Sequence, residues 1–250
     1  MLNTAIKFSK TSSNILLKYF WQKFWVETKD FKDIVTQADI ESENNILKVI
    51  KESFPEHSIF SEEAGLEDQQ SEYMRFIDPL DGTGNFERTI PVYGISAGLT
   101  DRNNPILWVI SIPSLNNIFS AEQEKWAFKN EKKITVSDRD ISKSFVYIQS
   151  PWKEKERVLK ILDKVSEKVQ MTRIFDASAF SLSQVADWSA EAYIHTNSVP
   201  HDVIAWVVLI REAWGRVTDW NGKERTLESK NILASNWIIH NELLEIIKNI

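Results

Sequence analysis

Two aspartates three residues apart, Asp78 and Asp81, are the side chains of this 250-residue chain whose types and spacing best suit chemistry. They lie in the segment FIDPLDGTGNF (76–86), and the apolar strand predicted over YMRFI leads directly into Asp78. Pro79 stiffens the exit of that strand, so a tight turn can point both carboxylates into one space. Carboxylate oxygens side by side favour a hard cation, and Mg²⁺, held by a few carboxylates, water and substrate phosphate, is the natural occupant.

The residues that follow predict a site for an anion. Gly82, Thr83 and Gly84 indicate the start of a helix, whose free backbone N–H groups and positive dipole end attract phosphate. Taken alone, the same residues are equally typical of a surface turn. There is no phosphate-binding G-x-x-x-x-G-K-[ST] motif. Leu80 stands where an aspartyl-phosphate phosphatase would carry its second Asp, so we interpret Asp78 as a metal ligand rather than a nucleophile.

Three further acids, Asp39, Glu62 and Asp202, stand out by position. Each has a plain structural interpretation when it is taken alone. Asp202 begins a strongly apolar helix, where a carboxylate ordinarily stabilises the positive end of the dipole. Glu62 and Glu63 would be a solvated pair after a strand, and Asp39 would be a helix-surface residue.

Composition restricts the class of protein. Apolar residues make up 42% and charged residues 26% of the chain, as in ordinary globular proteins. The net charge of −6 argues against direct nucleic-acid binding, which needs a basic surface, but is compatible with a phosphorylated small molecule. The absence of cysteine excludes disulfides and thiolate metal sites. No segment suggests a signal peptide or a membrane span, so we expect a cytoplasmic enzyme.

The elements that must position these residues follow from apolar periodicity and turn residues. We expect an amphipathic first helix, a helix over 36–53 with Thr36 as its N-cap, and a largely antiparallel sheet over 92–136 that includes KITVS (133–137). From about 145, strands and helices alternate, ending with a buried helix over DVIAWVVLIREAW. This change predicts an N-terminal α+β subdomain (1–147) that carries most metal ligands and a C-terminal α/β subdomain (148–250) that carries Asp202 and the substrate-facing residues. Most of the ten tryptophans are expected to fill the core.

The segment 76–86 resembles the WIDPLDGTTNF signature of the inositol monophosphatase family. Four other segments resemble family motifs in the same order along the chain: KDFKDIVTQAD (29–39), PEHSIFSEEAG (55–65), FSAEQEKWAFKNEKKITVS (119–137, resembling F-x-A-x-x-G-x-G-A-x-x-N-G-x-x-x-x-V-S) and HDVIAWVVLIREAWGRVTDWNG (201–222). The resemblance spans nearly the whole chain and is closest to the bacterial SuhB-type members. It implies the layered αβαβα sandwich of inositol monophosphatases and fructose-1,6-bisphosphatases, which is an α/β fold.

The resemblance also implies roles for individual residues. Two to three Mg²⁺ ions would be held by Glu62, Asp78, the Leu80 carbonyl, Asp81 and Asp202, with Asp78 bridging and Glu62 serving the weaker third ion. Asp39, Glu62 and Thr83 would be catalytic, with Thr83 and Asp39 orienting the attacking water. Gly82 and Thr83 would bind phosphate, and Lys29, Ser178 and His195 would lie near the substrate. Lithium is expected to inhibit, and a homodimer is expected, to which the apolar, Trp-rich region 92–128 lends weak support.

Departures from the family pattern concern the substrate more than the metal. His195 stands where many members place a Glu, His201 stands where a Trp precedes the metal-binding Asp, and Asp176-Ala177-Ser178 replaces Gly-Ser-Ala. Ser61 and Trp214 each replace a Gly. We therefore expect hydrolysis of an inositol-1-phosphate-like monoester, and His195 suggests a substrate with an extra anionic or acceptor-rich group. The alternatives are a superfamily phosphatase for fructose 1,6-bisphosphate, a nucleotide 3′-phosphate or histidinol phosphate, and a SuhB-like non-catalytic partner of the transcription machinery.

Overall fold

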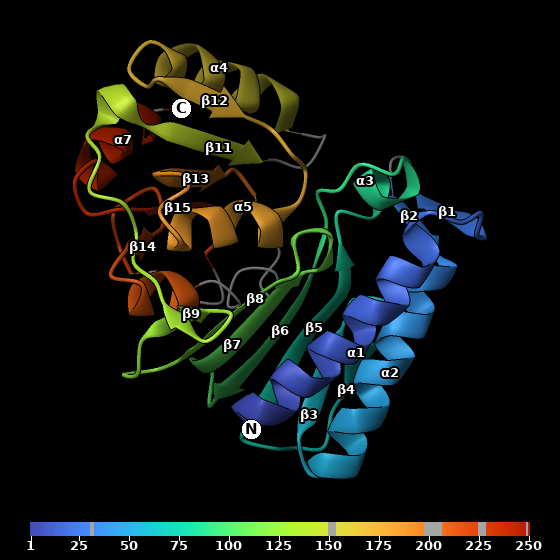
Figure 1. Ribbon diagram of the computed structural model, residues 1–250. Helices are drawn as coiled ribbons and strands as arrows, with labels where there is room; N and C mark the ends of the chain where they lie inside the picture. The colour runs from blue at the N-terminus through green and yellow to red at the C-terminus, as the bar shows by residue number, and fades with distance from the viewer. Residues whose placement is uncertain (31–32, 150–153, 198–206, 225–228, 249) are drawn as a thin grey trace.

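Five alternating layers of helices and sheets make up the chain, as Figure 1 shows. The computed structural model describes residues 1–250 except 31–32, 150–153, 198–206, 225–228 and 249. The layers are, in order, the helix pair α1 (Leu2–Phe20) and α2 (Gln37–Ser53), an eight-stranded sheet, a middle helical layer that contains α5 (Ser178–Ala186) and helical residues 207–212, a five-stranded sheet, and the pair α4 (Lys155–Ser166) and α7 (His240–Ile247). This is the predicted αβαβα sandwich.

The eight-stranded sheet carries the segment 76–86 on one of its inner strands. Its order is β10-β9-β8-β7-β6-β5-β3-β4, and β3 pairs in parallel with β5 while the other neighbours are antiparallel. Its strands are β3 (Ser58–Ser61), β4 (Gly65–Glu67), β5 (Tyr73–Asp81), β6 (Gly94–Asp101), β7 (Asn104–Ile112), β8 (Asn117–Glu122), β9 (Ala127–Lys129) and β10 (Lys132–Lys133). A short helix, α3 (Thr83–Glu87), follows β5 directly. Strands β3 and β5 therefore end at the same edge of the sheet.

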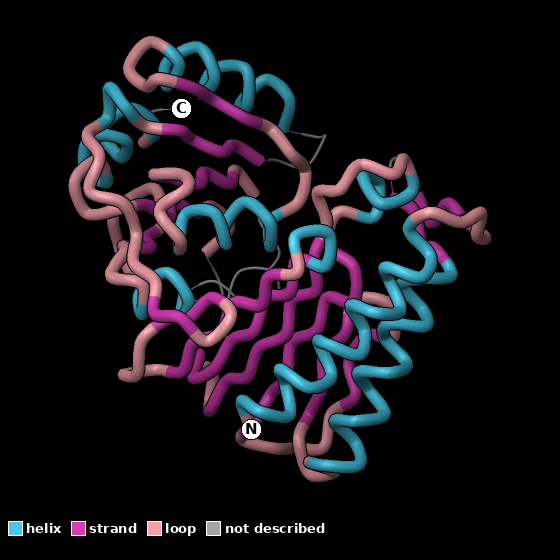
Figure 2. Tube along the Cα trace, viewed as in Figure 1, coloured by secondary structure: helices cyan, strands magenta, loops and turns pink. Residues whose placement is uncertain are grey.

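The five-stranded sheet has the order β12-β11-β13-β15-β14. Its strands are β11 (Phe145–Gln149), β12 (Met171–Arg173), β13 (Ala192–His195), β14 (Arg216–Thr218) and β15 (Ile232–Ser235). Strand β11 is parallel to both of its neighbours, and the remaining pairs are antiparallel. A separate hairpin, β1 (Val26–Asp30) and β2 (Asp33–Thr36), joins α1 to α2. Figure 2 shows that the helices lie on the faces of the two sheets.

Three apolar clusters hold the layers together. One lies between the pair α1 and α2 and the large sheet, and includes Phe8, Ile46 and Ile77. A second surrounds the middle helical layer, where Leu182 and Ile210 are fully buried. The third joins the five-stranded sheet to α4 and α7. Every helical layer thus buries one or both faces against a sheet, which is how such elements become stable in water.

Most predicted elements are present at the expected places. Helix α2 begins after Thr36, whose side chain accepts from the N–H groups of Ala38 and Asp39, and it ends at Ser53 with Phe54 as its C-cap. The predicted strand over KITVS is wrong, because β10 ends at Lys133 and residues 134–140, which lead toward the other sheet, form neither strand nor helix. The predicted helix from residue 202 lies partly outside the described residues. The boundary between residues 147 and 148 stays a prediction.

The prediction that the tryptophans fill the core is also wrong. Of the tryptophans that the structure describes, Trp108 and Trp220 are buried. The exposed ones are Trp21, Trp25, Trp126, Trp188, Trp214 and Trp237. Composition could not reveal this, because a large ring counts as apolar wherever the backbone places it. No helix among the described segments is long and apolar enough to cross a membrane.

Candidate active site

Asp78 lies where β5 leaves its regular pairing with β6. The register between these strands shifts between Asp78 and Asp81, which is a bulge of the kind often found beside active sites. The Asp78 carboxylate accepts from the backbone N–H of Leu80 at 3.0 Å, which closes a tight turn over Pro79. On the other side of this turn, Ser42 of α2 donates to the Pro79 carbonyl at 2.9 Å. The turn that the sequence predicted is thus stabilised both by a hydrogen bond within it and by one from α2.

Gly82 connects the end of β5 to the start of α3. It caps the helix with φ +84°, a left-handed conformation that side chains with a Cβ rarely adopt. A Cβ added here would also lie 2.9 Å from the Val92 carbonyl oxygen and 3.1 Å from the Ala177 Cβ. The five-residue helix that follows places Thr83 at its first position. The position therefore fits glycine on both conformational and steric grounds.

Asp81 is held by the N-terminus of α5. Its two carboxylate oxygens accept from the backbone N–H groups of Ser178 at 3.1 Å and Ala179 at 2.7 Å. The positive end of this nine-residue helix stabilises the charge. Burial nevertheless raises the pKa of the Asp81 carboxyl above its usual range. The Phe180 N–H also donates to this carboxylate, and of its roughly four acceptor positions at least one remains for a cation.

Asp39 and Thr83 lie together, as the resemblance implied. The Thr83 hydroxyl is 3.2 Å from one Asp39 oxygen and 2.9 Å from the Leu80 carbonyl oxygen, which are alternative acceptors for its single proton. The other Asp39 oxygen accepts from the backbone N–H of Thr36 at 2.8 Å and from its hydroxyl at 2.5 Å. Burial raises the pKa of Asp39 to about 7, although these hydrogen bonds from Thr36 oppose the shift.

Glu62 lies beside Asp78 because β3 and β5 are parallel and end together. The backbone N–H of Glu62 donates to the Ile77 carbonyl at 3.1 Å, and its side chain shares a hydrogen bond with Asp78. Two carboxyl groups can share such a bond only through a proton. Burial raises the pKa of Glu62. The pair therefore lies where a cation would replace the proton.

Lys29 is held beside the acidic turn. Its ammonium nitrogen lies 2.6 Å from a carboxylate oxygen of Glu63, the residue that follows Glu62. The Glu63 side chain is only 9% exposed, which strengthens this ion pair relative to one on the surface. Lys29 is therefore an ordered side chain next to the acidic turn rather than a freely moving surface lysine.

Of the residues expected near the substrate, Ser178 belongs to a hydrogen-bonded chain between α5 and the small sheet, and His195 lies at the end of β13 in that sheet. The Ser178 hydroxyl lies 2.9 Å from that of Tyr193, and the Tyr193 hydroxyl donates to Gln149 at 3.1 Å. His195 is buried, and its Nδ1 accepts from the backbone N–H of Asn197 at 3.2 Å. Nδ1 is therefore an acceptor, which leaves Nε2 as the proton-bearing nitrogen of the neutral ring.

The donor set suits Mg²⁺. Glu62, Asp78 and Asp81 offer carboxylate oxygens and Leu80 offers a carbonyl, and burial together with the neighbouring acids raises the pKa of Glu62, as expected where carboxylates gather without a cation. In the part of the chain that the structure describes, no three acidic or histidine side chains already converge as a metal cluster. Asp202 and His201 lie outside the described residues. Glu62, Asp78, Leu80 and Asp81 would hold the ion.

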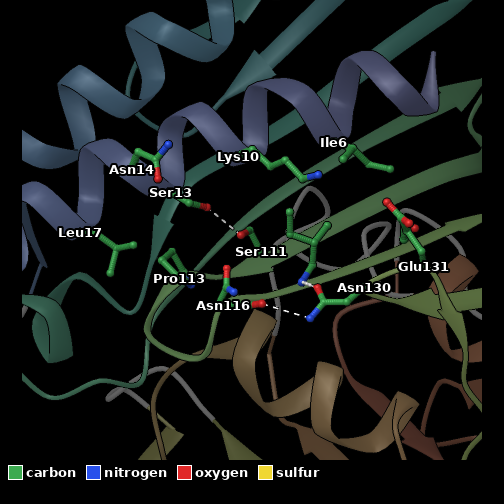
Figure 3. A pocket seen from close by; sticks show the side chains of 12 residues that line it. Ile6, Lys10, Ser13, Asn14, Leu17, Ser111, Pro113, Asn116, Asn130 and Glu131 are labelled. Atoms are coloured by element: carbon green, nitrogen blue, oxygen red, sulfur yellow. Dashed lines mark hydrogen bonds between the residues drawn. The ribbon is translucent and has the colours of Figure 1, made fainter.

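A separate cavity of about 590 Å³ lies beside α1 (Figure 3). Lys10 and Asn14 of α1 face Asn116, Asn130 and Glu131 across it. The hydrogen bond between the hydroxyls of Ser13 and Ser111, at 2.7 Å, crosses beneath the helix. None of the predicted site residues lines this cavity, so it is separate from the candidate site.

Sequence reasoning missed two residues that shape the site, Ser42 and Glu43. Ser42 contacts the Pro79 carbonyl, and the Glu43 carboxylate accepts from Ser61, Glu63 and Ala64. The only available signal was their spacing, since they follow Asp39 by three and four residues and so share its face of the helix. A polar stripe of this kind is ordinarily a solvated face.

The layered fold and the carboxylates at the end of β5 match what the class of metal-dependent phosphatases requires. A model of the inositol monophosphatase family matches residues 1–250, so the chain belongs to this family. It is 30% identical over 250 residues to a fructose-1,6-bisphosphatase/inositol-1-monophosphatase of Thermotoga maritima, covering 100% of this chain and 96% of that protein. It is also 30% identical over 255 residues to the Nus factor SuhB of Haemophilus influenzae, covering 99% and 96%. The crystal structure of the suppressor protein SuhB of Bartonella henselae superposes with a TM-score of 0.95 at 27% identity, over 98% of this chain and 97% of that one.

Proposed function

We propose that the chain is a Mg²⁺-dependent phosphatase that hydrolyses a small phosphate monoester. The observation that carries the proposal is the placement of the Asp39–Thr83 pair beside the Glu62–Asp78 pair. One pair suits the handling of a proton and the other suits the holding of a cation, and hydrolysis of a phosphate ester needs both functions close together.

Each residue has a defined task. Asp39 accepts a hydrogen bond from Thr83, which leaves the lone pairs of the Thr83 oxygen free to orient an attacking water. The backbone N–H groups of Gly82 and Thr83 bind phosphate oxygens. Glu62, Asp78, the Leu80 carbonyl, Asp81 and Asp202 hold two to three ions. When bound, Mg²⁺ lowers the pKa of water and offsets the charge of the phosphate.

The substrate is a small phosphorylated metabolite of the inositol-phosphate or sugar-bisphosphate kind. The Thermotoga relative, whose name joins fructose-1,6-bisphosphatase and inositol-1-monophosphatase, supports this range. Because His195 stands in place of an acidic residue, it favours a substrate that carries a second anionic group, such as a sugar bisphosphate. A panel of inositol 1-phosphate, fructose 1,6-bisphosphate, a nucleotide 3′-phosphate and histidinol phosphate separates these substrates.

The test is phosphate release with and without Mg²⁺, together with the variant Asp78→Asn. This substitution keeps the size of the side chain but removes the charge shared with Glu62, so turnover is expected to fall roughly a thousandfold. Asp163→Asn, at an exposed position of α4, is the matched control and should behave as wild type. Turnover of Asp78→Asn within tenfold of wild type at saturating Mg²⁺ would overturn the proposal. Inhibition by lithium is expected in the same assay.

A second candidate function rests on the relatives named Nus factor SuhB. The chain would then act as a partner in a transcription complex, through protein contacts rather than direct binding of nucleic acid. Both candidates place the protein in the cytoplasm and are compatible with a homodimer. Loss of every phosphatase activity, together with co-purification with the transcription machinery, would favour this second function.

A further inference from the structure

Helix α2 directs two buried acids toward the candidate site. Asp39 lies in its first turn and Glu43 one turn later, so both side chains project from the same face. Glu43 is only 5% exposed, although the acids Glu62 and Glu63 lie close by. Another negative charge in this place is unfavourable unless its hydrogen bonds compensate for it.

One oxygen of Glu43 holds the turn that carries Glu62. It accepts from the Ser61 hydroxyl at 2.5 Å, from the Glu63 N–H at 3.1 Å and from the Ala64 N–H at 3.0 Å. Hydrogen bonds to an ionised carboxylate are stronger than those between neutral groups. The donors flank Glu62 on both sides, while the N–H of Glu62 itself is bound to Ile77 of β5. The backbone of Glu62 is thereby fixed against both α2 and β5.

The Ser61 contact accompanies a departure from the family motif, which has glycine at this position, and glycine has no hydroxyl to donate. Glu43 gains a third donor from this change. The contact crosses from α2 to the end of β3, eighteen residues along the chain. It tightens the link between the helix and the turn.

We propose that Glu43 is a positioning residue that sets the place of the Glu62 carboxylate beside Asp78 and so determines the affinity for Mg²⁺. The inference rests on the proposed function. Residues that orient metal ligands without touching the metal typically change metal affinity or activity 10- to 100-fold when they are removed. Glu43 acts through the backbone of the 61–64 turn.

The variants Glu43→Ala and Glu43→Gln test this role. Removal of the carboxylate in Glu43→Ala should raise the Mg²⁺ concentration for half-maximal activity by about 10- to 100-fold, with a far smaller change in kcat at saturating Mg²⁺. Glu43→Gln keeps an acceptor oxygen in the same place and should restore most of the affinity. Calorimetric titration of each substrate-free protein with MgCl₂ gives the same order of affinities independently of activity.

Two further variants complete the test. Glu52→Ala removes an exposed acid from the same helix and should leave the Mg²⁺ affinity unchanged. Ser61→Ala removes one donor, so a smaller loss of affinity is expected even where Glu43→Ala does not fold. Its effect should largely vanish in the background of Glu43→Ala, since the two residues act through one contact.

The outcomes separate the two proposals. If wild type neither binds Mg²⁺ nor releases phosphate, the proposed function fails. If wild type does both, and Glu43→Ala and Ser61→Ala bind Mg²⁺ as wild type does, Glu43 has only a structural role and the inference is overturned. A lower melting temperature with an unchanged Mg²⁺ affinity overturns it in the same way.

Discussion

Gly82 connects the two parts of the candidate site, since Asp81 precedes it and Thr83 follows it. Its φ of +84° and the 2.9 Å distance from an added Cβ to the Val92 carbonyl oxygen leave no room for a side chain. Gly82→Ala is therefore expected to lower the free energy of unfolding by about 1–3 kcal/mol. It should also reduce phosphate release, because the N–H groups of residues 82 and 83 would turn away from the phosphate.

Gly84 provides the matched control. It lies two residues further on within α3, has no positive φ, and a Cβ added there meets nothing within 4 Å. Gly84→Ala should leave stability unchanged or raise it slightly, because alanine favours helix. Thermal unfolding and phosphate release of both variants check the prediction. Equal effects of the two substitutions would contradict it.

At the residue scale, the sequence predicted contacts within one segment better than contacts between segments. The turn from Asp78 to Asp81 follows from Pro79 and the spacing of the aspartates, and the Thr36 cap of α2 follows from residue type. The bond from Asp81 to the N-terminus of α5 joins residues 97 positions apart. No local pattern indicates such a partner. Family resemblance indicated which acids matter, but not what holds them.

At the scale of elements, three turns carry tryptophan in a conformation that suits glycine. Trp126, Trp188 and Trp214 have φ of +86°, +63° and +66°. The family motifs place glycine at the positions of Trp126 and Trp214. A bulky residue in this region costs about 1–3 kcal/mol. The rings of Trp126 and Trp214 stack at 5.4 Å, which offsets part of the cost at those two positions.

Trp188→Gly is expected to raise the free energy of unfolding by about 1 kcal/mol, because relief of the left-handed strain exceeds the added entropy of glycine in the unfolded chain. The melting temperature should then rise by about 2–4 °C. Trp237→Gly is the control, since Trp237 is equally exposed, also lies beneath an arginine, and has no positive φ. Trp237→Gly should not stabilise the protein. A fall in melting temperature for Trp188→Gly would refute the argument.

These tryptophans also show where element-level prediction failed. Apolar periodicity predicted a sheet over 92–136, and β8 and β9, which flank Trp126, lie within that range. Trp188 and Trp214 each lie between a helix and a strand. The ring at a turn has no strand or helix face to occupy, so it extends into solvent. The strand predicted over KITVS failed for a related reason. At its start this segment still pairs with β9, where Lys133 lies opposite Phe128 and the Ile134 N–H donates to the Ala127 carbonyl. The chain then passes between the two sheets, and the Val136 N–H donates to the Ala213 carbonyl rather than to a neighbouring strand, so the strand does not continue.

At the scale of the whole molecule, the candidate site spans two layers that fold around different cores. The large sheet supplies Glu62 and Asp78, and α5 of the middle layer holds Asp81. The alternation of helices and strands in the sequence predicted these layers, but not which helix end would meet the site. Activity is therefore expected to depend on how the layers pack. Agents that loosen the small sheet should lower activity, because they would displace α5, whose N-terminus binds Asp81.

Acid is one such agent, because it acts on His240 at the start of α7. This ring is fully buried, with Nε2 3.0 Å from the Thr218 hydroxyl and Nδ1 2.7 Å from the Ser235 hydroxyl. Burial, and secondarily the nearby Arg216, lowers the pKa of His240 to about 3. In the unfolded chain the pKa returns to about 6.5. Between these two values the unfolded state binds one proton more than the folded state.

The contribution of His240 to stability is therefore fully present above about pH 6.5 and is lost as the pH falls toward 3, with a slope approaching about 1.4 kcal/mol per pH unit. The raised pKa values of Asp39, Glu62 and Asp81 act in the opposite direction, since these folded carboxyls take up protons first. Comparison with His240→Gln cancels their contribution, because they are the same in both proteins. Urea unfolding from pH 8 to pH 4.5 should show the variant less stable at pH 8 and the difference shrinking as the pH falls. Parallel curves would show that protonation of His240 does not limit the stability of the small sheet.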